Sequence, residues 1–569
     1  MKRILFYLFI LILTVNAGCG GGGGGGGGDN DEGGGSGGGT LTSPVKGSYV
    51  VVAWNDLGMH CMDGKDYSIF SILPPYNNLH AQVIKRADGA EKLVTSGIKV
   101  TYEAYADPTS GTINTISSTK TNFWDYVDRL FNVSLSPDYG LNLSDPTVSY
   151  PTPGSTPAEM QFNQTHNWWE AEGIPVTPYN DDGTKNYYPM VKVVARDLNG
   201  QVLAETYAVL PVSDELDCSS CHSSLSGYND AKPSSGWVND PDPEKDWKLN
   251  ILRLHDEKNP DAIASTSMGS KYQGKNLFDT VDSYYQPILC ADCHSSNALQ
   301  TKGANGAPSL TRAIHKRHSS VKDPDTGKTL DSINDRTACY RCHPGSKTRC
   351  LRGAMGGNNI ECQDCHGDMS TVADPNRQGW LDMPACQYCH NRTGPKGDFT
   401  RYKSVFSSGN TLRTVYSSRF ATNRNTPLTG LSLYRFSKGH GGLQCEACHG
   451  STHAIYPSTH YNDNLQSQHL QGYKGTLSNC ATCHETPPST SNKGPHGMHI
   501  VGQTWVKEHK KHAKANLSDC ADCHGSDYRG TFLSAMWQSR TLSIEDGSKT
   551  LSKGHKVSCY DCHNGPKGD

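Results

Sequence analysis

The sequence is poor in the residues that build an ordinary hydrophobic core. Only 35% of its 569 residues are hydrophobic, aromatic residues make up 8%, and glycine is abundant at 59 residues. The formal charge of −3 is near neutral and no long basic patch is present, so the composition does not point to nucleic acid as a partner. A chain of this composition would struggle to fill a core with its own side chains.

The cysteines indicate what else could fill the core. Most of the 21 cysteines fall in nine copies of one pentapeptide, C-x-x-C-H. Two thiols three positions apart can attach to the two vinyl groups of one porphyrin, and the adjacent imidazole then lies under the iron, so each copy is a c-type haem attachment signature. A lone Cys-x-x-Cys pair can instead hold zinc or form a redox disulfide, but zinc does not need histidine directly after the second cysteine.

The motifs predict nine covalent haems. The attachment cysteines are Cys218, Cys221, Cys290, Cys293, Cys339, Cys342, Cys362, Cys365, Cys386, Cys389, Cys445, Cys448, Cys480, Cys483, Cys520, Cys523, Cys559 and Cys562. The proximal iron ligands are His222, His294, His343, His366, His390, His449, His484, His524 and His563. Buried porphyrin faces would replace aliphatic side chains and offset the conformational entropy of a loop-rich chain.

Further histidines between the motifs are numerous enough to give every iron a second imidazole. Three pairs repeat an i, i+3 spacing, which puts both rings on one face of a helix, where each can meet a different iron. Two axial imidazoles leave no open coordination position. The alternative for any single one is a surface histidine, and we leave out His469. The candidate distal ligands are His255, His315, His318, His440, His453, His460, His496, His499, His509, His512 and His555.

The N-terminal sequence is typical of a segment that directs export and membrane anchoring. Lys2-Arg3 and the apolar run over residues 4–15 form a signal peptide, because the run is too short to span a bilayer. Asn16-Ala17-Gly18-Cys19 resembles the lipobox of bacterial lipoproteins, although Asn16 stands where that family usually has Leu. The resemblance implies a signal peptide over 1–19 and lipidation at Cys19; the alternative is an ordinary signal peptide with unmodified Cys19. Residues 20–46, rich in glycine, form a flexible tether.

Two domains are expected after the tether. Residues 47–212 carry no haem motif and show short runs of alternating hydrophobicity, which predict an all-β, sandwich-like domain with a helical or irregular insertion over 158–172. The strands are expected at 49–54, 81–85, 98–105, 190–196 and 202–209, the last two joined by an Asn199-Gly200 hairpin turn. Residues 213–569 form a loop-rich, mostly irregular or α-helical multihaem domain, with helices over 246–258, 310–318 and 504–515.

One stretch of the β-rich domain is unusual. Met59, His60, Cys61 and Met62 place four soft or borderline ligands in a row, a set that suits copper, with His80 downstream. Three alternatives remain open. The stretch can be a packed turn that fills the core, His60 can be a distal haem ligand, or Cys61 can form a disulfide with Cys350 in an oxidising compartment.

With these features together, the chain resembles the outer-membrane or extracellular multihaem c-type cytochromes of metal-reducing bacteria. The likeness includes residues 54–62, residues 73–77 and residues 445–456 (CEACHGSTHAIY). It implies a cell-surface outer-membrane lipoprotein that transfers electrons and is not an enzyme. Its donors would be other c-type cytochromes or an outer-membrane conduit, and its acceptor a mineral, an electrode or a soluble metal. Assembly into a homo-oligomer or filament stays open.

The alternative function is enzymatic: a multihaem oxidoreductase that reduces a small oxyanion such as nitrite. Such an enzyme needs one haem with an open face, often marked by lysine in place of the motif histidine. The sequence has no C-x-x-C-K motif. An open haem would then require that one distal histidine be missing, and this distinguishes the two functions.

Overall fold

The fold is described from a computed structural model of the protein. The described residues are 47–566, without residues 88–91, 267, 346, 358, 376, 378, 380–405, 409–410, 413–434, 436–437, 439, 486–498, 500, 532–533, 537–538 and 553. The predicted signal peptide, Cys19, the tether, the motif Cys386/Cys389/His390 and His496 therefore lie outside the described residues.

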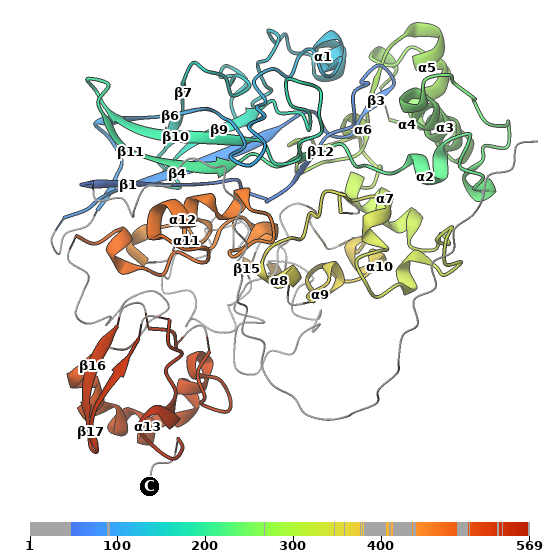
Figure 1. The fold of residues 1–569 in the computed structure, drawn as a ribbon. Coiled ribbons are helices and arrows are strands. Elements are labelled where there is room, and N and C mark those ends of the chain that lie inside the picture. The colour runs from blue at the N-terminus through green and yellow to red at the C-terminus, as the bar shows by residue number, and fades with distance from the viewer. Residues whose placement is uncertain are drawn as a thin grey trace, which may run out of the picture. The chain divides into compact units, whose positions relative to one another are not determined.

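Two antiparallel sheets dominate the N-terminal region (Figure 1). The first has the order β1 (Tyr49–Trp54), β4 (Asn77–Lys85), β9 (Trp168–Ile174), β8 (Gln161–Asn163), with β5 (Lys92–Val94) also paired to β4. The second has the order β11 (Val202–Val209), β10 (Met190–Asp197), β6 (Ile98–Tyr105), β7 (Ala158–Glu159). The prediction of a β-rich N-terminal region is confirmed.

Alternate residues of each strand project to the same face, and one face of each sheet lies in a core that the two sheets share. Val51, Leu79 and Val83 from the first sheet lie in the same buried cluster as Tyr102 and Val193 from the second. The Asn199-Gly200 hairpin joins β10 to β11 as predicted, and Gly200 has φ of 88°, which glycine adopts without steric cost.

The predicted helical or irregular insertion over 158–172 was wrong. The segment contributes β7, β8 and the first part of β9. Strand β9 pairs with β4 and alternates buried and half-buried residues, so its structure depends on a partner about 90 residues away in the chain.

Helices and loops follow the sheets. The longest helices are α3 (Pro243–Lys258), whose first turn is capped by the Asp242 side chain, and α13 (Gln503–His524). The others are α1 (Phe123–Phe131), α2 (Ser219–His222), α4 (Ala262–Ser265), α5 (Leu277–Tyr284), α6 (Cys290–Cys293), α7 (Leu310–His318), α8 (Ala354–Gly357), α9 (Cys362–His366), α10 (Met369–Val372), α11 (Cys445–His449) and α12 (Leu465–Gln471). Among the described residues, no helix is both long and apolar enough to cross a bilayer.

Short strands and buried side chains join the sheets to later parts of the chain. Two strands near the start of the chain, β2 (His60–Cys61) and β3 (Phe70–Ser71), pair in parallel with β12 (Val212–Ser213) and β13 (Ile288–Leu289). Ala447 of α11 and Leu470 of α12 share a buried cluster with Val52 and Trp54 of β1. The remaining strands form two separate hairpins, β14 (Phe406–Ser408) with β15 (Thr411–Leu412) and β16 (Arg540–Ile544) with β17 (Gly547–Leu551). The segments on either side of the predicted boundary at residue 212 therefore fold against one another.

Candidate functional site: paired histidines

Among the described residues, seven motif histidines face a second histidine from elsewhere in the chain. The ring centroids of these pairs lie between 5.6 and 6.4 Å apart. The pairs are His222 with His318, His294 with His255, His343 with His315, His366 with His453, His484 with His440, His524 with His499 and His563 with His509. Every second member belongs to the predicted set of distal ligands.

This spacing has a simple meaning for metal chemistry. Imidazole nitrogens bind a metal ion at about 2 Å, so two rings bound from opposite sides have their centroids roughly 6 Å apart. In the pair with the closest centroids, Nε2 of His509 and Nε2 of His563 are 3.3 Å apart. In the other six pairs the ring centroids are 6.0 to 6.4 Å apart, which matches this spacing.

The hydrogen bonds of the rings fix which nitrogen is available. Nδ1 of His315 lies 2.7 Å from the Thr311 carbonyl oxygen, and Nδ1 of His318 lies 2.8 Å from that of Ile314. A carbonyl oxygen only accepts, so each Nδ1 carries the proton and donates it. Nε2 then keeps its lone pair, which is the form that binds a metal. Nδ1 of His294, His453, His509 and His524 also lies against a backbone carbonyl, at 2.7 to 2.9 Å.

Burial keeps three of these imidazoles neutral. It lowers the pKa of His222 and of His315 to about 4, and that of His366 to about 3, with a smaller effect from neighbouring groups. At neutral pH these three rings are therefore uncharged and can act as ligands without first losing a proton.

Helix α7 connects two of the pairs. Its His315 and His318 lie one turn apart, and they face His343 and His222, which belong to different haem motifs. The fourth motif lies close to the third, because the Cys362 thiol is near enough to raise the pKa of the Cys339 thiol. The first, third and fourth haem motifs are thus neighbours in space.

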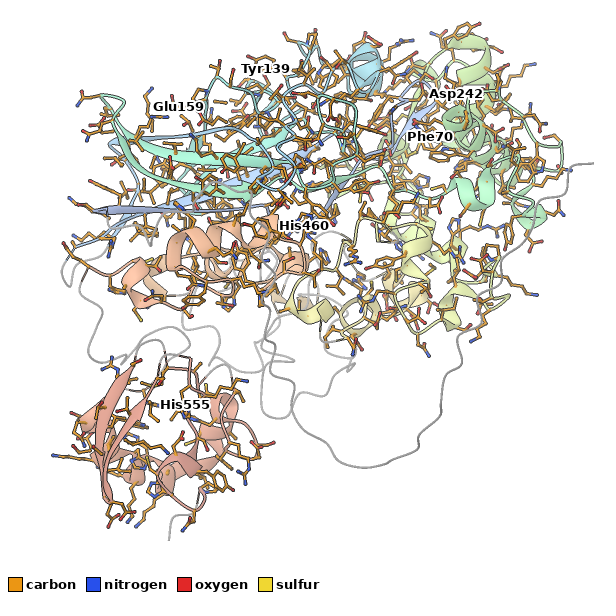
Figure 2. The ribbon with its side chains drawn as sticks, viewed as in Figure 1. Phe70, Tyr139, Glu159, Asp242, His460 and His555 are labelled. Carbon is orange, nitrogen blue, oxygen red and sulfur yellow. The ribbon has the colours of Figure 1, made fainter. Side chains whose placement is uncertain are left out.

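Several predicted site residues have other partners. His555 Nε2 lies 2.8 Å from Asp561 Oδ2, and His512 lies beside Trp505 with 5.1 Å between ring centroids. The His460 ring packs on Tyr188 at 3.7 Å (His460 and His555 are labelled in Figure 2). His449 ends α11, the helix that packs on β1.

The proposed copper stretch is divided between two environments. His60 Nε2 is 2.8 Å from the Asp56 carboxylate. Burial raises the pKa of the Cys61 thiol, and the Cys350 thiol, which lies near it, raises this pKa further. Cys61 and Cys350 are both free thiols. Successive residues in a strand project to opposite sides, so His60 and Cys61 do not face one point. Copper at this stretch stays a prediction.

The sequence did not predict that a distant turn holds the His453 ring in place. The Leu57 carbonyl lies 2.8 Å from its Nδ1, and the Asn55 side chain holds this turn by accepting from the amides of Leu57 and Gly58. Gly58 has φ of 79°, and a Cβ there would lie 3.1 Å from the backbone nitrogens of His453 and Ala454. A lone glycine within a run of larger residues was the available signal.

Comparisons with known proteins add no relative. No family model matches the chain, and neither a curated protein nor a solved structure shows significant similarity to it.

Proposed function

We propose that the protein is a multihaem c-type cytochrome that conducts electrons at the cell surface through nine covalent haems, most of them held by two histidines. The observation that carries this proposal is the set of seven histidine pairs, each with one member from a C-x-x-C-H motif. A haem iron held by two imidazoles exchanges single electrons and has no position open to substrate.

The chain itself would contribute attachment, orientation and proximity. The motif cysteines would supply thioether bonds, and the carbonyl groups that accept from Nδ1 orient six of the paired imidazoles. The closeness of the first, third and fourth motifs supports transfer from one haem to the next. The export signal and Cys19 support an outer-membrane lipoprotein with other cytochromes as donors and an extracellular metal or electrode as acceptor.

The haem content and spin state of the purified protein test this proposal. Its intact mass should exceed that of the apoprotein by nine haem masses. The oxidised protein should give low-spin signals by electron paramagnetic resonance, and the reduced protein should bind little carbon monoxide, because both axial positions are filled. It should also reduce ferric citrate rapidly.

Two outcomes would contradict the proposal. Seven or fewer haems per chain would refute the attachment sites. A wild-type protein that binds carbon monoxide at one haem and turns over nitrite there would favour the oxyanion reductase instead.

A further inference from the structure

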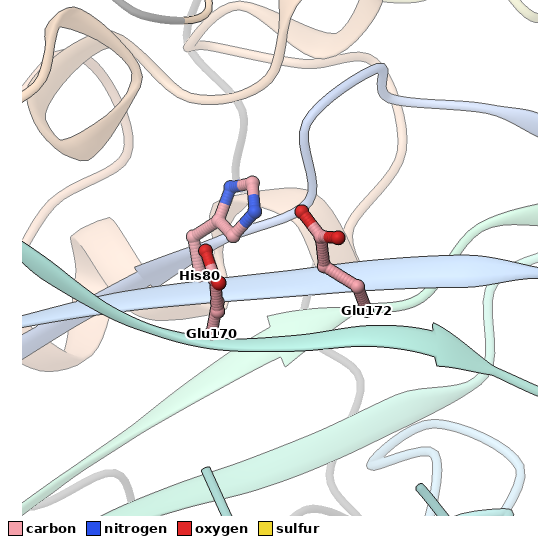
Figure 3. A group of neighbouring side chains, drawn as sticks. All are labelled: His80, Glu170 and Glu172. Atoms are coloured by element: carbon pink, nitrogen blue, oxygen red, sulfur yellow. The ribbon is translucent and has the colours of Figure 1, made fainter. Parts of the chain in front are cut away.

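The first sheet carries a group of metal-ligand side chains that no haem motif explains. His80 on β4 lies directly opposite Glu170 on β9, and Asn78 lies opposite Glu172. Because alternate residues of a strand share a face, His80, Glu170 and Glu172 project to the same side of the sheet (Figure 3). One ligand atom from each lies within 4.8 Å of the other two.

His80 is the unsatisfied member of this group. Its side chain is buried, with 3% exposed, and neither ring nitrogen has a hydrogen-bond partner among the described residues. The ring stacks on Trp168 with 4.2 Å between centroids, and Trp54 lies against it edge-on. Burial lowers the pKa of His80 to about 4, so the ring is neutral and offers a lone pair. A buried polar group without a partner is costly, and a bound ion would supply one.

The two carboxylates are held in place by neighbouring donors. Glu170 accepts from Trp168 Nε1 at 2.6 Å and from the Asn163 amide, and Glu172 accepts from Ser144 Oγ at 2.7 Å. Each carboxylate keeps lone pairs for a further partner. Donors of this kind orient carboxylate ligands in metal sites.

The local charge also favours a cation. Burial raises the pKa of Glu170, and it raises that of Glu172 to about 7, because two carboxylates share a poorly solvated site. The nearby Arg435 guanidinium lies 3.7 Å from Asp56, whose negative charge it balances. A divalent ion bound between Glu170 and Glu172 would favour the ionised form of both carboxylates.

We propose that His80, Glu170 and Glu172 bind one divalent transition-metal ion of the zinc class, distinct from the haem irons. One nitrogen and two oxygen donors suit such ions, with water completing the coordination. Ligand atoms bind at about 2 Å, so the three must approach one another by roughly 1 Å, which small side-chain rotations provide. The site is independent of the proposed electron-transfer function.

Zinc retention by the full-length holoprotein tests the site. The protein is dialysed against EDTA, incubated with Zn²⁺, desalted and analysed for zinc and iron by mass spectrometry. The wild type should retain one zinc ion per chain more than Glu172→Gln, which keeps the shape of the side chain and removes its charge. The control Glu159→Gln changes an exposed glutamate on β7 that pairs with Lys99, and it should retain zinc like the wild type.

Zinc binding and the haem absorption spectrum of each variant together distinguish loss of the metal site from loss of the fold. Glu172→Gln and His80→Gln should each weaken zinc binding about tenfold or more, while their haem absorption spectra stay unchanged. If His80→Gln does not fold, Glu172→Gln decides. Equal zinc retention by the wild type and Glu172→Gln would overturn the proposal, and it would leave the haem sites and the proposed electron transfer unaffected.

Discussion

His453 is held in place by hydrogen bonds to a backbone carbonyl of a distant turn. Its Nδ1 donates to the Leu57 carbonyl, and its own amide approaches the same oxygen at 3.3 Å. This close approach requires the absence of a side chain at Gly58. The Arg352 guanidinium, held by Asp463 at 2.7 Å, also donates to the Gly58 carbonyl. The turn over residues 55–58 therefore orients a predicted iron ligand about 400 residues away.

We predict that Gly58→Ala displaces His453. The new Cβ would press on the backbone of His453 and Ala454, and a non-glycine residue at this φ costs roughly 1–2 kcal/mol. One haem should become partly high-spin and bind carbon monoxide, as measured by electron paramagnetic resonance and optical titration. The matched control is Gly97→Ala, because Gly97 has a similar φ of 77° and open space around its Cβ position. A high-spin signal in both variants, or in neither, would contradict the positioning role.

For single residues, the sequence indicates which histidines are candidate iron ligands, but it does not indicate which of them face a motif histidine. His509 and His555 were both assigned to the distal set. His509 lies on α13, where its Nδ1 meets the Val506 carbonyl and its Nε2 faces His563. His555 instead meets Asp561, a residue between the two cysteines of the last motif. The choice depends on which acceptor lies nearest in space, and local sequence does not contain that information.

Helix α7 is the clearest case in which one element serves two sites. Its nine residues are too few for a stable isolated helix, although the Ser309 side chain caps its first turn by accepting from the Arg312 amide. His315 and His318 face different motif histidines, so binding at both would hold the helix in place. The i, i+3 spacing predicts that the two rings meet different irons, and in α7 they face different motif histidines. For His509 and His512, which have the same spacing, only His509 faces a motif histidine among the described residues.

We predict that His318→Ala opens one haem and leaves the others closed. The His222 site loses its facing imidazole, whereas His315 keeps its own carbonyl partner. Reduced protein should bind one carbon monoxide per chain, and His315→Ala/His318→Ala should bind two. Lys316→Ala is the control, because this exposed side chain lies on the same helix between the two histidines. No change in carbon monoxide binding in His318→Ala would show that the pair does not hold an iron.

Elements with strong local patterns were predicted well, and those defined by distant partners were not. The strand at 49–54 is a run of apolar residues, whereas the strand at 98–105 alternates apolar and polar residues, and the predicted bounds of both match the structure. Helix α12 has a polar sequence and was missed, yet it is buried, with Gln466 accepting from the Ala53 amide at 2.7 Å. Its environment is created by β1 and β11, which its own residues cannot indicate.

At the scale of the whole molecule, the facing histidines of seven motifs in the described part of the chain come from other segments. His366 faces His453 and His484 faces His440, so many of the facing pairs close loops of tens of residues. The nine motifs, and therefore the attachment chemistry, are readable in the sequence because each motif is local. The pairing is a property of the fold, since it depends on which loops the sheets and helices bring together.

Lipidation at Cys19 would attach the whole protein to a membrane. If Cys19 is lipidated, cells grown with an alkyne analogue of palmitate should label the wild type, and Cys19→Ser should remain unlabelled because it lacks the acceptor thiol. The variant should move to the soluble fraction with its haem content unchanged, since the first motif begins about 200 residues later and the glycine-rich tether between them would span roughly 25 Å. Cys350→Ser, which removes another cysteine outside the motifs, should stay labelled and membrane-bound. Labelling of Cys19→Ser would refute lipidation at this residue, and an unlabelled variant that still sediments with membranes would assign the attachment to another part of the chain.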